Sequence, residues 1–113
     1  MVDCLFCKII AGTIPSSKVY EDDQSYAFAD INPQAPTHVL IVPRKHIASL
    51  DHASPVDIEV LGHLHVVAAG IARGKGLSNG YRTVINTGDD AGQTVDHLHV
   101  HLLGGRAFHW PPG

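Results

Sequence analysis

The chemistry of this chain is concentrated in one short segment where histidine alternates with apolar residues. Residues 97–103 read His-Leu-His-Val-His-Leu-Leu, so His97, His99 and His101 occupy every second position. A period of two is typical of a β-strand, in which alternate side chains share a face about 6.5–7 Å apart. A row of imidazoles suits a small anion such as phosphate, because one ring can attack while its neighbours donate protons and hold the site in register. We interpret the central His99 as a nucleophile; metal binding and a merely solvent-facing strand are the alternatives.

Two further segments carry residue types that could bind an anion or a metal. The loop at 88–92 supplies two glycines, which let backbone N–H groups approach an anion, and Thr94 adds a hydroxyl just before the histidine row. Taken alone, this loop is also consistent with an ordinary turn. The only cysteines, Cys4 and Cys7, form one Cys-x-x-Cys. A disulfide across so short a loop would stabilise little, so the spacing indicates metal or redox chemistry.

Composition restricts the class of protein. The length of 113 residues predicts a single domain spanning residues 1–113, small enough that dimerisation would help to bury apolar surface. The net charge of -3 and the pI of about 6.3 argue against duplex nucleic acid as a partner. The apolar runs are short for a membrane span, and the chain does not start like a secretory signal. We therefore expect a cytoplasmic protein without a membrane partner.

The elements that must position these residues form an α+β pattern. We predict a short helix capped by Asp3 and ended by Gly12, and a long amphipathic helix from Ser54-Pro55 to Arg73. Strands are predicted at 19–21, 25–30, 38–42, 81–86 and 95–103, the first two as a hairpin and the third as a buried central strand. The sum is a five-stranded, mostly antiparallel sheet with one long and one short helix.

Several motifs together resemble the histidine-triad (HIT) family, in its Hint branch of nucleotide-binding proteins. They are the histidine row, Asp-Ile-Asn-Pro-Gln-Ala-Pro-Thr-His at 30–38, Gly-Gln-Thr-Val at 92–95, Gly-Gly-Arg at 104–106 and Trp-Pro-Pro-Gly at 110–113. The resemblance covers essentially the whole chain. It implies a HIT-like fold whose sheet continues across a homodimer, with the 104–113 tail reaching the partner. It also implies hydrolysis of purine nucleoside phosphoramidates, including adenylylated lysine, with no metal required for catalysis.

The resemblance also assigns roles to individual residues. His99 would attack the α-phosphorus and become nucleotidylated, His101 would assist at the phosphate oxygens, and His97 and His38 would form a supporting hydrogen-bond chain. Asp30 and the backbone of Ile31 would hold the ribose, while the tail would bring Trp110 near an active site. The base pocket would consist of Phe6, Ile9, Phe28 and Leu40, and the phosphate contacts would come from Asn86, Gln93 and Thr94.

Each of these roles has a plainer structural alternative. Asp30 is equally suited to starting a turn, and His38 to being a satisfied buried histidine. The four apolar pocket residues read as ordinary core, and the tail could fold on its own subunit. We interpret His52, His63 and His65 as surface or helix residues.

The resemblance to zinc-bearing HIT proteins extends to Cys4, Cys7, His46 and His97. Four protein ligands leave no open position, so such a zinc would be structural and not catalytic. A free dithiol or ordinary buried cysteines are the alternatives, and a His97 that binds zinc is not expected to bond His38. Two rival functions also remain. One is a nucleotide-binding regulatory module with incidental hydrolysis. The other is a dinucleoside polyphosphate hydrolase or nucleotidyl transferase of the same superfamily, against which the Trp-Pro-Pro-Gly ending argues.

Overall fold

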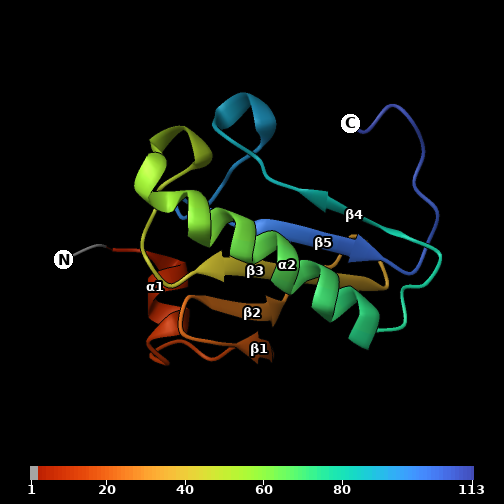
Figure 1. Ribbon diagram of the computed structural model, residues 1–113, viewed down its shortest axis with the longest axis horizontal. Helices are drawn as coiled ribbons and strands as arrows, with labels where there is room; N and C mark the ends of the chain where they lie inside the picture. Colours follow the sequence, from red (N-terminus) through yellow and green to blue (C-terminus); the bar gives the residue numbers. More distant parts are fainter. Residues whose placement is uncertain (1–2) are drawn as a thin grey trace.

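The computed structural model describes residues 3–113 as one antiparallel sheet with a long helix on one face (Figure 1). The order of strands across the sheet is β1-β2-β3-β5-β4, and every pair of neighbours is antiparallel. The predicted α+β, five-stranded architecture is therefore confirmed. The helices and strands are α1 (Leu5–Ile10), β1 (Lys18–Glu21), β2 (Ser25–Ala29), β3 (Thr37–Pro43), α2 (Ile58–Gly74), β4 (Tyr81–Val84) and β5 (Val100–Gly104).

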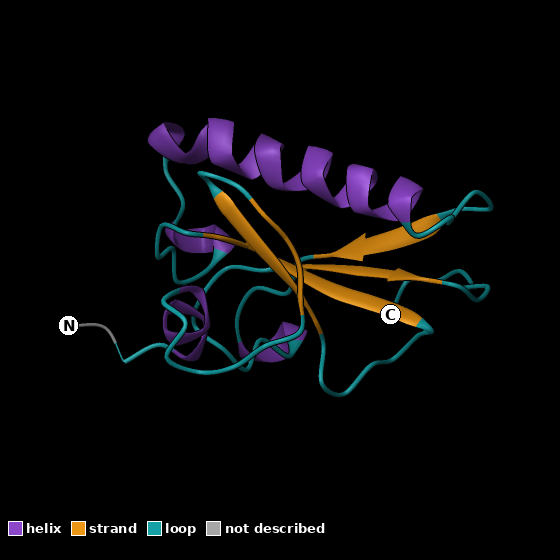
Figure 2. Cartoon of the chain, turned by 90° about the horizontal axis from the view of Figure 1, so that it is seen from below, coloured by secondary structure: helices purple, strands orange, loops and turns teal. Residues whose placement is uncertain are grey.

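The alternation along the central strands separates two apolar layers. On β3, Val39 and Ile41 join the larger core beneath α2, whereas Leu40 and Val42 pack with α1 on the opposite face. Figure 2 shows α2 lying along one side of the sheet, with the shorter helical segments away from it. Because His38 and His101 alternate with residues of the α2 core, they face the same side as α1. The functional face of the sheet is therefore the one that α1 covers.

The long helix begins as the sequence predicts. Pro55 opens a 3₁₀ turn that runs directly into α2, and Ser54 and Asp57 form a reciprocal capping box. Residues Pro55–Gly74 reach a mean hydropathy of 1.3 and are long enough to cross a membrane. Here one side of α2 covers the sheet, with Leu64, Ala68 and Ala72 fully buried, so the helix belongs to the core of this domain, although Val66 on its other side is exposed.

Three predicted boundaries are wrong. Strand β5 begins at Val100 and not at residue 95, because β3 ends at Pro43 and Leu98 instead donates its N–H to the Ile47 carbonyl. Strand β4 ends at Val84, two residues early. Helix α1 is capped by the Cys4 thiol, which accepts from the Cys7 N–H, while Asp3 pairs with Lys8. The alternation still holds through 97–103, since Leu98, Val100 and Leu102 all enter the α2 core.

The turn between β1 and β2 depends on one carboxylate that the sequence did not single out. Asp22 accepts hydrogen bonds from the Gln24 and Ser25 N–H groups, from the hydroxyls of Ser25 and Tyr20, and from His63 on α2 at 2.7 Å. Burial alone would raise the pKa of Asp22, but these hydrogen bonds outweigh it and hold the pKa well below its usual range. His63, interpreted above as a surface or helix residue, lies on α2 and links this helix to the hairpin.

We expect Asp22→Asn to lower the free energy of unfolding by about 2 kcal/mol, because bonds to an ionised acceptor are lost. Asp23→Asn is the matched control, since Asp23 is exposed and makes no side-chain hydrogen bond within residues 3–113. Because the folded pKa of Asp22 lies below the unfolded one, its contribution is present above about pH 3.9 and is lost on acidification below it. Urea unfolding of both variants at neutral pH measures the difference; equal midpoints would contradict the assignment.

Candidate active site and metal centre

A chain of hydrogen bonds fixes the proton positions on His38 and His101. The Gln34 N–H donates to His38 Nδ1 at 3.0 Å, so in the neutral ring the proton must sit on Nε2. That nitrogen lies 2.9 Å from His101 Nδ1, which must then accept. His101 therefore carries its own proton on Nε2. The register of β3 against β5, which sets Leu40 opposite His101, brings the two rings together.

A different contact orients His99. Its Nδ1 lies 2.7 Å from the carbonyl of His97, which can only accept, so Nδ1 carries the proton and Nε2 keeps its lone pair. The ring is buried, lies 4.8 Å from that of His101 between centroids, and meets Phe6 of α1 edge-on at 5.1 Å. These two adjacent rings therefore offer a lone pair on His99 Nε2 and a proton on His101 Nε2, and nucleophilic attack on phosphorus needs one group of each kind.

The predicted hydrogen bond between His97 and His38 is absent. His38 is hydrogen-bonded to His101, and the ring of His97 is directed to the Pro43 carbonyl. His97 Nε2 donates to the Pro43 carbonyl at 2.8 Å, so its Nδ1 lone pair points to the opposite side. It faces Cys4, Cys7 and His46. The ring of His97 therefore faces the two cysteines and His46, and it does not contact His38.

The metal-type cluster has the dimensions of a tetrahedral site. Tetrahedral zinc with typical Zn–S and Zn–N bonds places S and N donors about 3.6 Å apart and two N donors about 3.3 Å apart. The Sγ atoms of Cys4 and Cys7 lie 3.4 and 3.5 Å from His97 Nδ1, and Cys7 Sγ lies 3.4 Å from His46 Nδ1. The two Nδ1 atoms are 3.2 Å apart. All four donor atoms lie within 4.8 Å of one another, so these residues fit the ion.

The surroundings of the cluster also favour a metal. The bond from His97 Nε2 to the Pro43 carbonyl is the outer contact that usually orients a histidine ligand. Burial lowers the pKa of His97, which keeps the ring neutral, as a ligand must be. Burial, followed by the hydrogen bond and charge of Cys4, raises the pKa of the Cys7 thiol to about 11 in the metal-free chain. Zinc binding must therefore displace a proton from Cys7.

A second group of metal-type side chains, formed by Asp30, His38 and His101, is better explained by hydrogen bonding. His38 Nε2 carries a proton because Nδ1 already accepts from Gln34, and that proton is directed to His101 with Asp30 Oδ2 at 3.4 Å. A metal at Nε2 would have to displace it. Asp30 Oδ1 accepts from the Asn32 N–H at 2.8 Å, so the turn-capping alternative for Asp30 is also realised.

The predicted base-pocket residues lie together beside the histidines. Phe6 and Ile9 from α1 meet Phe28 from β2 and Leu40 from β3 in one cluster, each less than a tenth exposed. They are therefore part of the hydrophobic core, as their alternative interpretation predicts, and they also lie where they could form the floor of a base pocket. Ile31 is 99% exposed, so its side chain is free to cover a bound group.

The predicted phosphate ligands are of two kinds. Gln93 is already committed: its Oε1 accepts from the Gly88 N–H, and its Nε2 donates to the carbonyls of Ala48 and Val95. It shapes the glycine loop and is not a free donor to phosphate. Thr94 is exposed and Asn86 half-buried, and neither side chain has a hydrogen-bond partner within the described part of the chain. Both remain free to contact a ligand.

The tail is tied to its own subunit by its backbone. Arg82 on β4 donates to the carbonyls of His109 and Pro112, at 2.9 and 3.5 Å. The indole of Trp110 is nevertheless 85% exposed. The structure thus anchors the backbone of the tail and leaves the Trp110 indole facing solvent.

We expect His101 to stay neutral well into the acid range. Burial, then the neighbouring His99 and His38, lower the pKa of His101 to about 4, against which Asp30 acts weakly. Unfolded histidine titrates near 6.5, so the unfolded chain binds more protons than the folded one between about pH 6.5 and 4. The stability that His101 contributes is therefore lost as pH falls through that window. A ¹⁵N NMR titration of the ring checks this; a midpoint near 6.5 would contradict it.

Comparisons with known proteins agree with the geometry. The model of the HIT domain matches residues 11–108. A 14 kDa zinc-binding protein of Zea mays is 53% identical over 111 residues, covering 96% of this chain and 87% of the relative. The crystal structure of a HIT family hydrolase from Legionella pneumophila superposes with a TM-score of 0.96 at 50% identity, covering 98% of this chain and 100% of that one. A histidine triad nucleotide-binding protein from Candida albicans gives 0.82 at 35% identity, with coverages of 98% and 85%.

Proposed function

This chain belongs to the HIT family, and from that premise we propose that it hydrolyses purine nucleoside phosphoramidates through a nucleotidyl intermediate on His99. One observation carries the proposal: hydrogen bonds fix a lone pair on His99 Nε2 and a proton on Nε2 of the neighbouring His101 ring. The names of the related proteins, a hydrolase and a nucleotide-binding protein among them, support the substrate class.

The proposed reaction has two displacements. The lone pair on His99 Nε2 forms a bond to the α-phosphorus as the phosphorus–nitrogen bond to the amine breaks, and the amine nitrogen takes up a proton from solvent as it leaves. His101, whose ring lies 4.8 Å from that of His99 between centroids, would donate its Nε2–H as a hydrogen bond to the phosphoryl oxygens and stabilise their developing charge. Water then attacks the phosphorus as the bond from phosphorus to His99 Nε2 breaks, which releases AMP, returns one proton to solvent and restores the neutral imidazole.

We assign the nucleoside to the face between α1 and the loop after β2. The cluster of Phe6, Ile9, Phe28 and Leu40 would receive the base, with Ile31 closing over it. Asp30 would accept the ribose hydroxyls through Oδ2. Asn86, Thr94 and the backbone of the glycine loop would contact the phosphate.

The proposed zinc is structural. Cys4, Cys7, His46 and His97 would hold it, and it would supply a cross-link between α1, the segment after β3 and the histidine row. All four positions would be taken by protein, so the reaction proposed here needs no metal. The zinc-binding name of the maize relative supports this part of the proposal.

A homodimer would complete the arrangement. Strand β4 is an edge strand, and Tyr81 on it, Val66 on α2 and Trp110 in the tail are exposed apolar groups that a second copy would cover. Continuation of the sheet across β4 would bring one subunit's tail toward its partner. A cytoplasmic location stays a prediction.

The test is hydrolysis of adenosine 5′-phosphoramidate by the full chain, measured as release of ammonia and AMP. We expect turnover that exceeds hydrolysis of diadenosine polyphosphates by the same preparation. A folded protein that binds AMP without turning over the phosphoramidate would favour the regulatory binding module. Faster cleavage of diadenosine polyphosphates, or transfer of the nucleotide to another phosphate, would favour the other rival.

A further inference from the structure

The turn that follows β5 reaches back to the loop before β3. The guanidinium of Arg106 donates to the Gln34 carbonyl through both Nε and Nη2, at 3.2 and 3.1 Å. Gly105 precedes it with φ of +89°, and a Cβ there would meet the Pro36 Cβ at 2.9 Å. Only glycine lets the turn approach the loop this closely, so the contact between Arg106 and Gln34 is a built feature of the fold.

Gln34 is also the residue that sets the active-site protons. Its N–H donates to His38 Nδ1, and His38 in turn bonds His101. The backbone of Gln34 is thus held by Arg106 at its carbonyl and holds the catalytic relay at its N–H. The exposed guanidinium of Arg106 is thus connected through Gln34 and His38 to His101, whose Nε2 carries the proton.

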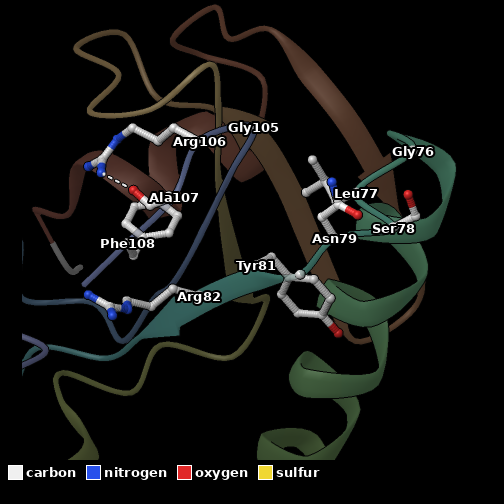
Figure 3. A pocket seen from close by; sticks show the side chains of 11 residues that line it. Gly76, Leu77, Ser78, Asn79, Tyr81, Arg82, Gly105, Arg106, Ala107 and Phe108 are labelled. Atoms are coloured by element: carbon white, nitrogen blue, oxygen red, sulfur yellow. Dashed lines mark hydrogen bonds between the residues drawn. The ribbon is translucent and has the colours of Figure 1, made fainter. Parts of the chain in front are cut away.

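Arg106 itself is held in a stack on the side of the tail. Its guanidinium lies 4.1 Å from the centroid of the Phe108 ring, and Arg82 lies 5.1 Å from the same centroid. Figure 3 shows the two arginines with Phe108 between them, together with the bond from Arg106 to the Ala107 carbonyl. These residues line a cavity of about 650 Å³ to which none of the histidines contributes, so Arg106 is placed to act through Gln34 and not on the reacting atoms.

We propose that Arg106 is a positioning residue that fixes the tautomers of His38 and His101 by holding the backbone of Gln34. This inference rests on the proposed function for its effect on rate. When Gln34 is released, His38 can carry its proton on Nδ1 and accept with Nε2. His101 Nδ1 must then donate, and its Nε2 presents a lone pair to the phosphate oxygens in place of a proton.

The experiment compares Arg106→Gln with Arg106→Lys in the full chain. Long-range ¹H–¹⁵N spectra of the ligand-free protein report the tautomers, and kinetics on adenosine 5′-phosphoramidate separate kcat from KM. We expect Arg106→Gln to mix the tautomers of His38 and His101 and to lower kcat about tenfold, a part of the usual effect of losing one hydrogen-bond donor to a developing oxyanion. Arg106→Lys, which keeps the positive charge and the reach of the side chain but not the forked pair of donors, should fall between this variant and the wild type.

Arg82→Gln is the matched control. It removes an equal charge from the other side of Phe108 and loosens the tail, but it leaves Gln34 untouched. We expect its tautomers to match those of the wild type. Unchanged tautomers in Arg106→Gln would overturn the inference, as would identical changes in both variants. The spectra need no substrate, so a protein without phosphoramidase activity would refute the proposed function and leave the tautomer result to be judged separately.

Discussion

Replacement of His99 by alanine is expected to abolish phosphoramidate turnover, by at least about 10³-fold in kcat. The reason is that His99, which lies beside His101, donates from Nδ1 to the His97 carbonyl. This bond leaves the lone pair on His99 Nε2, where it can attack phosphorus. His101 has no lone pair on Nε2, and His97 directs its lone pair to the cysteines. No other described histidine is positioned to take over the attack. Steady-state release of AMP measures the loss.

The control for His99 is His65→Ala. His65 is exposed on α2, and its ring contacts only the Leu61 carbonyl. We expect full activity and an unchanged melting temperature in this variant. The pocket floor that contacts His99 comes from Phe6 and its neighbours, so AMP binding should survive in His99→Ala. Normal turnover by a folded His99→Ala protein would mean that another group attacks the phosphorus.

Loss of the metal is expected to have the second largest effect, on stability first. A ligand that binds only the folded chain stabilises it by about 4 kcal/mol when its free concentration is a thousand times its Kd. For a domain of this size that corresponds to a fall in melting temperature of about 20 °C on chelation or in Cys7→Ser. The cluster joins segments 93 residues apart in sequence, which explains why so much depends on it. Zinc content and thermal unfolding are the measurements.

The metal should also influence the nucleophile without taking part in the reaction. His97 uses its ring in the cluster and its carbonyl to orient His99. Cys4 caps α1, which carries Cys7 and the Phe6 that packs on His99. Chelated wild type and Cys7→Ser should therefore lose activity to a similar extent, and zinc should restore only the wild type. A folded wild-type protein that contains no zinc, and whose melting temperature is the same with and without chelator, would contradict a structural zinc.

The period of the histidine row made the active face predictable. Alternation alone placed His97, His99 and His101 on one side, and this holds even where strand pairing has stopped. The apolar run at 38–42 correctly identified the central strand, and Ser54-Pro55 the start of the long helix. Such local patterns can be interpreted from sequence because the side of an element on which a side chain lies depends only on its position along that element.

Contacts between distant segments could not be read in the same way. The ring of His97 turns toward Pro43 and the cysteines because β3 ends there, which depends on the register of two strands. The side chain of Gln93 is hydrogen-bonded to three backbone groups, and His63 is hydrogen-bonded to Asp22, forty-one residues away. Arg106 gave no signal beyond its place in the Gly-Gly-Arg turn. In each case the residue type was visible, but its partner is set by the packing of the sheet, the helices and their loops.

The most direct test of the account is the site of the covalent intermediate. Wild-type protein is mixed with adenosine 5′-phosphoramidate, quenched during turnover, and examined by intact mass followed by peptide mapping. We expect an adenylyl adduct on His99 that is absent from His99→Ala and is cleared when the substrate is exhausted. Turnover with the adduct on a different residue, or with no adduct and direct attack by water shown by stereochemical inversion at phosphorus, would contradict it.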